Sequence, residues 1–382
     1  MKRLKSFRRG FIAFMSVIFL LSAAVAHAEI YSGEGSYVMS EGENLGVAKE
    51  RAKADAMRNA AEKAGTYVKS YSRARNFELE EDVIETMTAN ILKLIGSPNF
   101  SPLKEVDNLE GVLIHVIVKV QIDDSDILRW LKKDEQEKSM LVAQNKALRK
   151  ANEEQARQIA ELKRQLAQST TKEDSERITN EFANEDKIFL SNQKVEEANK
   201  LHERIDYKGA IKLYDKAVQL NTNNALAYFG RGNAYYSLKQ YELAIQNYNK
   251  AININPDLYQ AYHNRGIVYG TLGQYDWAIQ NFDKVIKLNP NFANAYSCRG
   301  LAYANIGKYN NAIDDFTYAI VHLEPNISVI YRINNGSLQP YKAFDLNFAK
   351  LYQMRGLCYK KIGNDKKAKA DFTKAKELGY NG

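Results

Sequence analysis

The side chains of this sequence that offer binding chemistry are carboxamides close to apolar residues. Asn233 and Asn264 each carry N–H donors and a carbonyl acceptor in one plane, and can therefore bond the backbone of an extended peptide. Phe229 and Ile267 lie near them in the sequence and would supply apolar anchors. These four residues offer hydrogen bonds and apolar contact, without covalent chemistry.

Residues for other kinds of chemistry are sparse. The 5 histidines are scattered singly, and neither they nor the 2 cysteines form a pair at a zinc-site interval. Gly33-Glu34-Gly35 lacks the third glycine of a dinucleotide-binding loop. The segment 29–127 holds one histidine, His115, and no nucleophile elbow or evident pair of catalytic carboxylates. The sequence therefore predicts no enzyme activity, no cofactor and no metal site.

One scheme of residues recurs every 34 residues in the C-terminal half of the chain. Small residues predominate at positions 8, 20 and 27 of each copy, and large ones at positions 4, 11 and 24. The copies cover 191–224, 225–258, 259–292, 293–326 and 349–382. Small residues let two antiparallel helices approach closely, and large residues fill the seam to the next pair. The pattern therefore predicts a stack of five helix pairs.

These repeated residues resemble the tetratricopeptide repeat. The copy from 225 illustrates the match with Tyr228, Gly232, Tyr235, Ala244 and Pro256 at positions 4, 8, 11, 20 and 32. The resemblance implies an all-α superhelix, an α-solenoid whose concave surface holds a peptide or a helix of another protein. It implies no catalytic chemistry. One helix pair cannot bury its apolar face alone, so the copies must stack to share a core.

The concave surface should be lined by positions 2, 5, 6, 9, 12 and 13 of each first helix. In the second to fifth copies this set includes Phe229, Asn233, Tyr236, His263, Asn264, Ile267, Asn294, Ser297, Leu301, Asn305, Gln353 and Lys360. Chaperone-binding members of the family hold a C-terminal carboxylate between asparagines and cations. Asn233 and Asn264 match the two asparagines. Phe229, Asn294 and Cys298 stand where the cations would be, so we expect an internal peptide or a helix as the ligand.

The first residues of the chain predict export. Five basic residues precede an apolar stretch from Phe11 to Ala26: Lys2, Arg3, Lys5, Arg8 and Arg9. Ala26-His27-Ala28 then offers the small residues that a signal peptidase reads, so we expect a cleaved signal peptide, residues 1–28, and a periplasmic or secreted bacterial protein. An uncleaved anchor is the alternative, although about 16 apolar residues fall short of the roughly 20 that span a bilayer. Loss of the five basic residues lowers the formal net charge from +8 to +3, which argues against nucleic-acid binding.

The segment 29–127 predicts a small α+β domain. The expected elements are a strand over 30–39, a helix over 40–65, a strand over 66–75, a helix over 79–95 and a hairpin of 100–106 with 112–122. Gly33 and Gly35 mark a bulge or a close approach in the first strand. The first helix carries a stripe of small residues that could lie tightly against a sheet: Ala48, Ala52, Ala56, Ala60 and Ala64.

Further residues support these elements. In the second helix the inward positions should be Val83, Ile84, Met87, Ile91 and Leu94. The last strand alternates with one apolar face: Ile114, Val116, Val118, Val120 and Ile122. The run GEGSY, the alanine-rich helix and the run AGTYVKS resemble the N-terminal domain of the flagellar assembly protein T and related small envelope modules. The resemblance implies an envelope-associated scaffold domain and supplies no catalytic residue.

Residues 130–168 predict a coiled-coil helix. Two series recur every seven residues: Leu141, Leu148, Gln155 and Leu162, and four residues after each of them Asn145, Asn152, Ile159 and Leu166. Such a seam pairs helices, and asparagine within it specifies register and oligomer state. We therefore expect self-association through 130–168, with a solvated single-helix spacer as the alternative. Residues 169–188 are rich in Ser, Thr, Glu, Asp and Asn and predict a linker.

Residues 327–348 interrupt the repeats. Apolar residues alternate along the chain before Asn334-Asn335-Gly336, which predicts a short hairpin with an Asn-Gly turn. The hairpin is either part of the binding face or a surface insertion without a role. Cys298 and Cys358 occupy different repeat positions on either side of it, so we expect two free thiols.

Together these features predict an exported, noncatalytic scaffold that binds a protein or peptide client. One alternative is a coordinator of envelope constriction or of flagellar or surface-structure assembly. Another, of a different class, is an enzyme or cell-wall ligand binder that uses the α+β domain.

Overall fold

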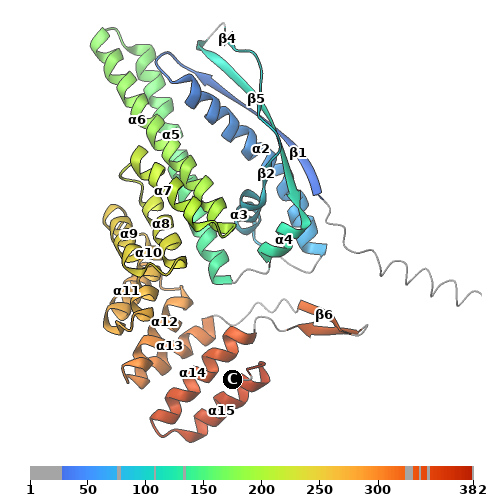
Figure 1. The fold of residues 1–382 in the computed structure, drawn as a ribbon, viewed down its shortest axis with the longest axis vertical. Coiled ribbons are helices and arrows are strands. Elements are labelled where there is room, and N and C mark those ends of the chain that lie inside the picture. Colours follow the sequence, from blue (N-terminus) through green and yellow to red (C-terminus); the bar gives the residue numbers. More distant parts are fainter. Residues whose placement is uncertain are drawn as a thin grey trace, which may run out of the picture. The chain divides into compact units, whose positions relative to one another are not determined.

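A computed structural model describes residues 28–74, 79–106, 109–131, 135–322, 330–334, 337–341 and 345–380. The predicted signal peptide lies outside these residues, apart from Ala28. The chain divides into two units. The first is an α+β unit that includes Ala48–Tyr71 and Glu81–Asp134, and the second is a helical unit that includes Glu135–Gly382. Figure 1 shows the elements of both.

The α+β unit is built around one long central strand, β5 (Leu109–Asp123). Strand β1 (Ala28–Met39) pairs antiparallel with it along its whole length, from Ala28 opposite Asp123 to Met39 opposite Val112. Three short strands pair antiparallel with β5 as well: β2 (Lys93–Leu94), β3 (Asn99–Phe100) and β4 (Lys104–Val106). The pairing of β4 with β5 confirms the predicted hairpin.

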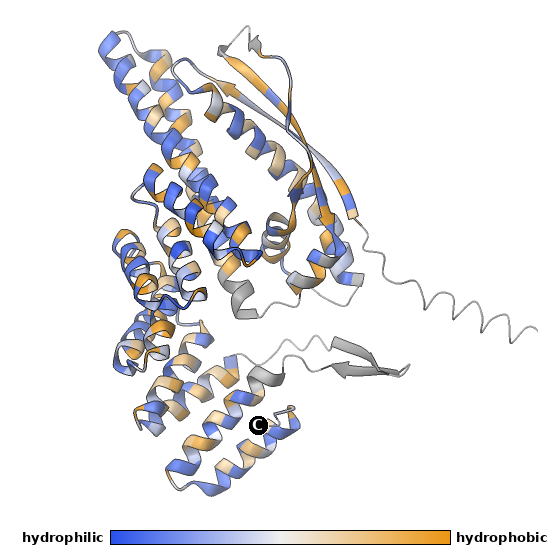
Figure 2. Ribbon diagram, in the orientation of Figure 1, coloured by the Kyte–Doolittle hydropathy of each residue, from blue (hydrophilic) through white to orange (hydrophobic). Residues whose placement is uncertain are grey.

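Three helices complete this unit: α2 (Leu45–Ala74), α3 (Glu81–Ile91) and α4 (Asp124–Leu131). Much of β5 is coloured as hydrophobic in Figure 2. The five residues of its predicted inward face are each 1% exposed or less. The strand therefore supplies one wall of the core, as its alternation predicts.

Close contact between β1 and α2 depends on small residues. The five alanines of the stripe on α2 are all fully buried. A Cβ atom on Gly33 would lie 2.0 Å from the carbonyl oxygen of Ala56, and one on Gly35 would lie 2.3 Å from that of Ala52. Both distances are far below van der Waals contact, so only glycine fits here. The predicted close approach is confirmed.

The outer edge of β1 is covered by a polar row on α2. Asp55 accepts a hydrogen bond from the Ser36 N–H at 3.3 Å. Asn59 donates to the Glu34 carbonyl at 2.7 Å, and Lys63 donates to the Ser32 carbonyl at 2.9 Å. The row precedes the alanines Ala56, Ala60 and Ala64 by one residue each. It satisfies backbone groups that an edge strand would otherwise offer to another chain.

Two predictions for this unit were wrong. Residues 66–74 continue helix α2 and form no strand. Their aromatic and β-branched residues favour a strand, but Val68 extends the every-fourth-residue stripe and is fully buried. Helix α3 ends at Ile91, and Leu94 lies in β2 with 38% of its surface exposed, so it does not face the core.

The helical unit begins with a hairpin of two long helices, α5 (Glu135–Gln168) and α6 (Lys172–Glu203). The predicted linker 169–188 was wrong, because α6 begins at Lys172. The Thr171 side chain caps it by accepting a hydrogen bond from the Asp174 N–H at 3.1 Å. Ile178 and Phe182, one turn apart, then pack on Ile159 and Leu162 of α5. The segment is polar in composition, which favours a linker, but Ile178 and Phe182 lie on one helix face.

The seam of α5 contacts α6 of the same chain. Asn192 donates to Asn152 at 3.1 Å, and Gln155 donates to the Glu185 carbonyl at 2.8 Å. Leu148 and Leu162 are also buried. Asn152, Gln155, Ile159 and Leu162 of the expected seam therefore have partners within the chain.

Helix pairs follow in the predicted register. The second half of α6 pairs with α7 (Tyr207–Leu220), followed by α8 (Ala225–Ser237) with α9 (Tyr241–Ile254) and α10 (Tyr259–Thr271) with α11 (Tyr275–Leu288). The last two pairs are α12 (Ala293–Asn305) with α13 (Tyr309–His322) and α14 (Asp345–Lys361) with α15 (Asp365–Glu377). We number these pairs repeats 1 to 5. The fold is thus a small α+β region followed by an α-solenoid.

The interruption between repeats 4 and 5 contains β6 (Ile330–Asn334) and β7 (Ser337–Tyr341), which pair antiparallel. This confirms the predicted hairpin, although its turn, Asn335-Gly336, lies outside the described residues. Helix α14 begins at Asp345, four residues before the predicted start of the fifth copy at Ala349.

An arginine at position 7 joins each of repeats 2 to 5 to the repeat before it. The four are Arg231, Arg265, Arg299 and Arg355. Each donates through Nε to position 23 of its own repeat and through Nη1 to position 25 of the preceding repeat. The guanidinium also lies over the tyrosine at position 4, with Cζ 5.2 to 5.5 Å from the ring centroid. This 34-residue series is visible in the sequence, but its role appears only in three dimensions.

Candidate partner-binding surface

The two carboxamides that the sequence singles out do meet. Asn264 on α10 donates through Nδ2 to Oδ1 of Asn233 on α8 at 2.8 Å. The Tyr248 hydroxyl of α9 donates to the same oxygen at 2.9 Å. Desolvation raises the pKa of Tyr248 far above its usual range, so the hydroxyl keeps its proton. The amide pair thus ties repeats 2 and 3 together while Nδ2 of Asn233 and Oδ1 of Asn264 keep capacity for a ligand.

A similar arrangement in repeat 1 is covered by α5. The Tyr214 hydroxyl donates to Oδ1 of Asn199 at 2.6 Å, with the same spacing of positions 24 and 9 as Tyr248 and Asn233. Gln144 of α5 donates to that oxygen at 3.1 Å. Helix α5 therefore occupies the place beside repeat 1 where Asn264 stands beside repeat 2. The part of the surface open to a partner begins at repeat 2.

The surface changes character from repeat 3 onward. At position 24 the tyrosines are replaced by Phe282, Phe316 and Phe372, and at position 9 the asparagines are replaced by Ile267, Leu301 and Leu357. The two changes belong together, because a phenyl ring offers no hydroxyl to an amide at position 9. Leu301 is 47% exposed and Leu357 is 42% exposed, on the neighbouring helices α12 and α14. Repeats 2 to 5 thus present an amide pair followed by apolar side chains.

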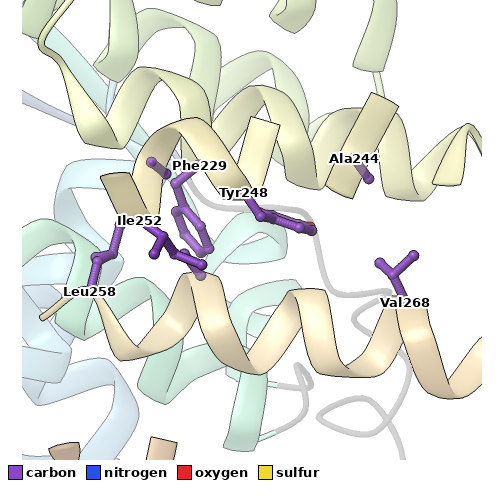
Figure 3. Close-up of a cluster of buried hydrophobic side chains, with 8 residues drawn as sticks. Phe229, Ala244, Tyr248, Ile252, Leu258 and Val268 are labelled. Carbon is purple, nitrogen blue, oxygen red and sulfur yellow. The ribbon is translucent and has the colours of Figure 1, made fainter. Parts of the chain in front are cut away.

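Two residues predicted to line the surface are buried instead. Phe229 is 2% exposed and packs against Tyr248, Ile252 and Leu258, as Figure 3 shows. His263 is fully buried, with ring centroids 5.7 Å from Phe282 and 5.0 Å from Phe292. Both stand at position 5, one turn before the glycine at position 8 that faces the second helix, so position 5 points into the same seam. Phe229 cannot anchor a ligand in this conformation.

The other predicted residues are accessible to different degrees. Tyr236 is 37% exposed, and its ring lies 6.0 Å from that of Tyr241. Ser297 donates to the Asn294 carbonyl at 2.9 Å, and both are half-buried. Asn305 is exposed and donates to the Leu301 carbonyl at 2.8 Å. Lys360 is exposed, while Ile267 and Gln353 are half-buried.

Chemistry beyond hydrogen bonding and apolar contact is limited at this surface. Burial lowers the pKa of His263 to about 4, so this imidazole is neutral at physiological pH. Cys298 and Cys358 are free thiols, as predicted, and desolvation raises the pKa of Cys298 to about 11, which disfavours the reactive thiolate. Within the described ranges, no three His, Cys, Asp or Glu side chains gather as metal ligands. None of the helices described there is both long and apolar enough to cross a membrane.

Comparison with known proteins agrees with the repeat register. Models described as TPR repeat match residues 198–239 and 232–273. Models described as tetratricopeptide repeat match residues 259–292, 281–314 and 349–378. The match to 259–292 has the bounds of the third predicted copy. A search among curated proteins found no match.

Solved structures with a similar fold cover about half of this chain. A crystal structure of MamA is 24% identical, covering 47% of this chain and 93% of its own, with a TM-score of 0.40. MamA 41-end from Desulfovibrio magneticus RS-1 is 20% identical, covering 50% and 94%, with a TM-score of 0.42. YrrB, described as a TPR protein with an unusual peptide-binding site, is 23% identical, covering 49% and 84%, with a TM-score of 0.40. The matches to the repeat family models identify residues 198–314 and 349–378 of this chain as an array of tetratricopeptide repeats.

Proposed function

We propose that this protein is a noncatalytic scaffold that binds a segment of another protein on the concave surface of repeats 2 to 5. The observation that supports it most directly is the paired change at positions 9 and 24. It leaves Leu301 and Leu357 exposed at equivalent places on the neighbouring helices α12 and α14, after the amide pair of α8 and α10. Two exposed leucines at the same repeat position offer a bound segment apolar contacts at a regular spacing.

Each part of the surface would serve a different part of the ligand. The Asn233 amide nitrogen and the Asn264 carbonyl can bond the backbone of an extended or helical segment. Leu301 and Leu357 would receive apolar side chains of that segment. Because the amides are already fixed by Tyr248, little conformational entropy is lost when they bind.

We also propose that the scaffold acts outside the cytoplasm, at the cell envelope or secreted from the cell. The basic and apolar residues before Ala28 support this part of the proposal. Cell fractionation of the full-length chain with mass spectrometry of its N-terminus tests it. A mature chain that begins at Glu29 in the periplasm or medium is expected, and an intact N-terminus in the cytosol would refute it.

The binding proposal is tested by photocrosslinking. A photoreactive amino acid replaces Leu301 or Leu357 on the first helices, or Leu243, which is 39% exposed on the second helix α9 and serves as the matched control. Positions 301 and 357 should crosslink the same protein in cells, and position 243 should not.

Affinity for the captured protein provides the second measurement. The double substitution Leu301→Asp and Leu357→Asp should weaken binding of the purified chain by at least about tenfold, because two charges would be desolvated. Both side chains are exposed, so the thermal midpoint should change little. Equal affinity of the variant, or the same crosslinks from position 243, would refute the assignment of the surface.

A further inference from the structure

The four arginines at position 7 have nearly identical settings but different partners. Arg299 donates to Asp315 at 2.9 and 2.7 Å and to Asp283 at 2.5 Å. Arg355 donates twice to Asp371, at 2.8 Å each. Arg231 donates to Asp215 at 2.6 Å and to the amide of Asn247 at 2.8 Å. Each of these three guanidinium groups therefore has at least one carboxylate as its counterion.

Arg265 of repeat 3 is bonded to amides. Its Nε donates to Asn281 at 2.8 Å, and its Nη1 donates to Asn249 at 2.5 Å. Asn281 donates through Nδ2 to the Trp277 carbonyl at 2.7 Å, which orients its oxygen toward Arg265. Both partners are neutral, so among the described residues no carboxylate bonds to this guanidinium.

The missing counterion changes the electrostatics of the site. Desolvation lowers the pKa of Arg265, with only Tyr269 and Tyr262 acting against it. At Arg355 desolvation has the same sign, but the bonds to Asp371 outweigh it and raise the pKa. A half-buried cation without a counterion is costly, and an anion from outside the chain would relieve that cost.

The same surface offers an open donor and a second cation. Nη2 bonds to aspartate in Arg299 and Arg355. In Arg265 the bonds to Asn281 and Asn249 use Nε and Nη1, and among the described residues Nη2 remains open to a ligand. Lys284 Nζ lies 5.8 Å from the centroid of the Tyr262 ring, and Arg265 Cζ lies 5.4 Å from it. Both cations therefore lie close to the same aromatic ring.

This site lies away from the concave surface. Positions 7 and 9 of one helix are separated by about 200° around its axis, so Arg265 and Ile267 project to opposite sides of α10. Arg265 bonds to α9 and α11, the second helices of repeats 2 and 3. An anion bound here would leave the concave surface free.

We propose that Arg265 is the centre of an oxyanion-binding site on the outer face of repeat 3, for a carboxylate or phosphate group, with Lys284 adding positive charge near the same ring. The guanidinium supplies a planar donor edge and the lysine a second positive charge, which together suit such a group. Asp315 gives Arg299 its carboxylate from within the chain. At Arg265 the carboxylate or phosphate comes from a ligand.

Isothermal titration of the mature full chain with inorganic phosphate, and separately with a tetraglutamate peptide, tests this site. Asn281→Asp gives Arg265 the internal carboxylate that Arg299 has and should weaken binding by at least about tenfold. Asn247→Asp makes the same change beside Arg231, which already has Asp215, and should leave the affinity within about twofold. Melting curves verify that each variant is folded.

The outcomes separate the sources of the anion. Binding of phosphate alone identifies a phosphate group, and binding of the peptide identifies an acidic side chain, and both support the site if Asn281→Asp weakens them. No saturable binding by the wild type, or equal binding by Asn281→Asp, overturns it. The Leu301→Asp and Leu357→Asp variant should retain anion binding, because both leucines lie away from Arg265. A failure of the anion-site proposal can therefore be distinguished from a failure of the proposed function.

Discussion

Glycine brings neighbouring elements together in both the α+β unit and the repeat array, but it meets different atoms in the two. In the first unit, a Cβ on Gly35 would lie 2.3 Å from the backbone nitrogen of Ala56 and from the carbonyl oxygen of Ala52. In the array, a Cβ on Gly266 would lie 2.8 Å from a ring carbon of Phe282. A ring can shift, whereas the backbone of a packed helix cannot.

The difference indicates where the molecule can vary. Where the backbones of β1 and α2 are in contact, only glycine fits on the strand. The residue type at these strand positions therefore cannot vary. The repeats rely on side chains against side chains, and they replace Tyr248 with Phe282 at the same position without loss of the fold. Surfaces that differ from repeat to repeat, such as the change from Asn233 to Ile267, can therefore arise in the array.

The largest expected effect is the loss of stability on substitution of Gly35, where β1 meets the backbone of α2. Gly35→Ala should destabilise the α+β unit by about 3 kcal/mol or more, because the new methyl group meets backbone atoms. Gly266→Ala should cost less, about 1 to 2 kcal/mol, because the Phe282 ring can move and alanine favours a helix. Chemical denaturation monitored by circular dichroism measures both.

Gly65 provides the control within the α+β unit. It lies in α2, and the nearest atom to an added Cβ is 3.8 Å away. Gly65→Ala should therefore stabilise the unit by about 0.5 to 1 kcal/mol through its helix propensity. Equal losses at Gly35 and Gly266 would contradict the distinction between backbone and ring contacts.

The second prediction concerns ring packing in the array and its dependence on pH. Burial lowers the pKa of His263 from 6.5 to about 4. Its contribution to stability is therefore complete above pH 6.5 and is lost as the pH falls toward 4, because the unfolded chain binds the proton first. The loss should approach about 3 kcal/mol at the acid end of this window.

The variant His263→Phe separates the pH dependence of stability that comes from His263 from the part that comes from carboxylates. Repeat 2 has Phe229 at the same position, buried against a tyrosine, so the array should accept the ring. Urea unfolding at pH 7 and at pH 4.5 should show a smaller pH effect in the variant than in the wild type. The same pH dependence in both proteins would show that His263 is not the responsible group.

The smallest effect concerns the turn inside each repeat. Ile205 has φ of 66° and is 73% exposed, whereas Gly273, Gly307 and Gly363 occupy the equivalent turn with φ of 73°, 78° and 76°. A β-branched residue is strained in this region, so Ile205→Gly should stabilise repeat 1 by about 1 kcal/mol. Lys239, with φ of 59°, should gain less on the same change because it is not β-branched. A lower thermal midpoint for Ile205→Gly would contradict this account.

Much of the fold follows from periodicity. The 34-residue scheme located the helix pairs of repeats 1 to 5, and the alternation from Ile114 to Ile122 located the central strand. Periodicity also outweighed composition where the two disagreed. Val68 continued the alanine stripe through residues that favour a strand, and Ile178 with Phe182 formed a helix face within a segment that resembled a linker.

The candidate surface was less predictable because it depends on contacts between helices. The sequence brought Asn233 and Asn264 together correctly, since they occupy matching faces of adjacent first helices. It placed Phe229 and His263 on the surface incorrectly. The periodicity of the first helix alone does not show which of its side faces is covered by the second helix of the repeat. The arginines at position 7 were missed for a similar reason, since their partners lie in two different helices.

The pairing of β1 with β5 has a consequence for the order of folding. It joins residues 28–39 to residues 112–123, so the sheet cannot close until the whole intervening chain is available. Each repeat, in contrast, contacts mainly its immediate neighbours and can form as soon as two pairs exist. We therefore expect the slow step of folding to lie in the N-terminal unit, although that unit is synthesised first. Until then α2 has no completed sheet against its alanine stripe, so this region of the newly made chain exposes apolar surface that a chaperone can bind.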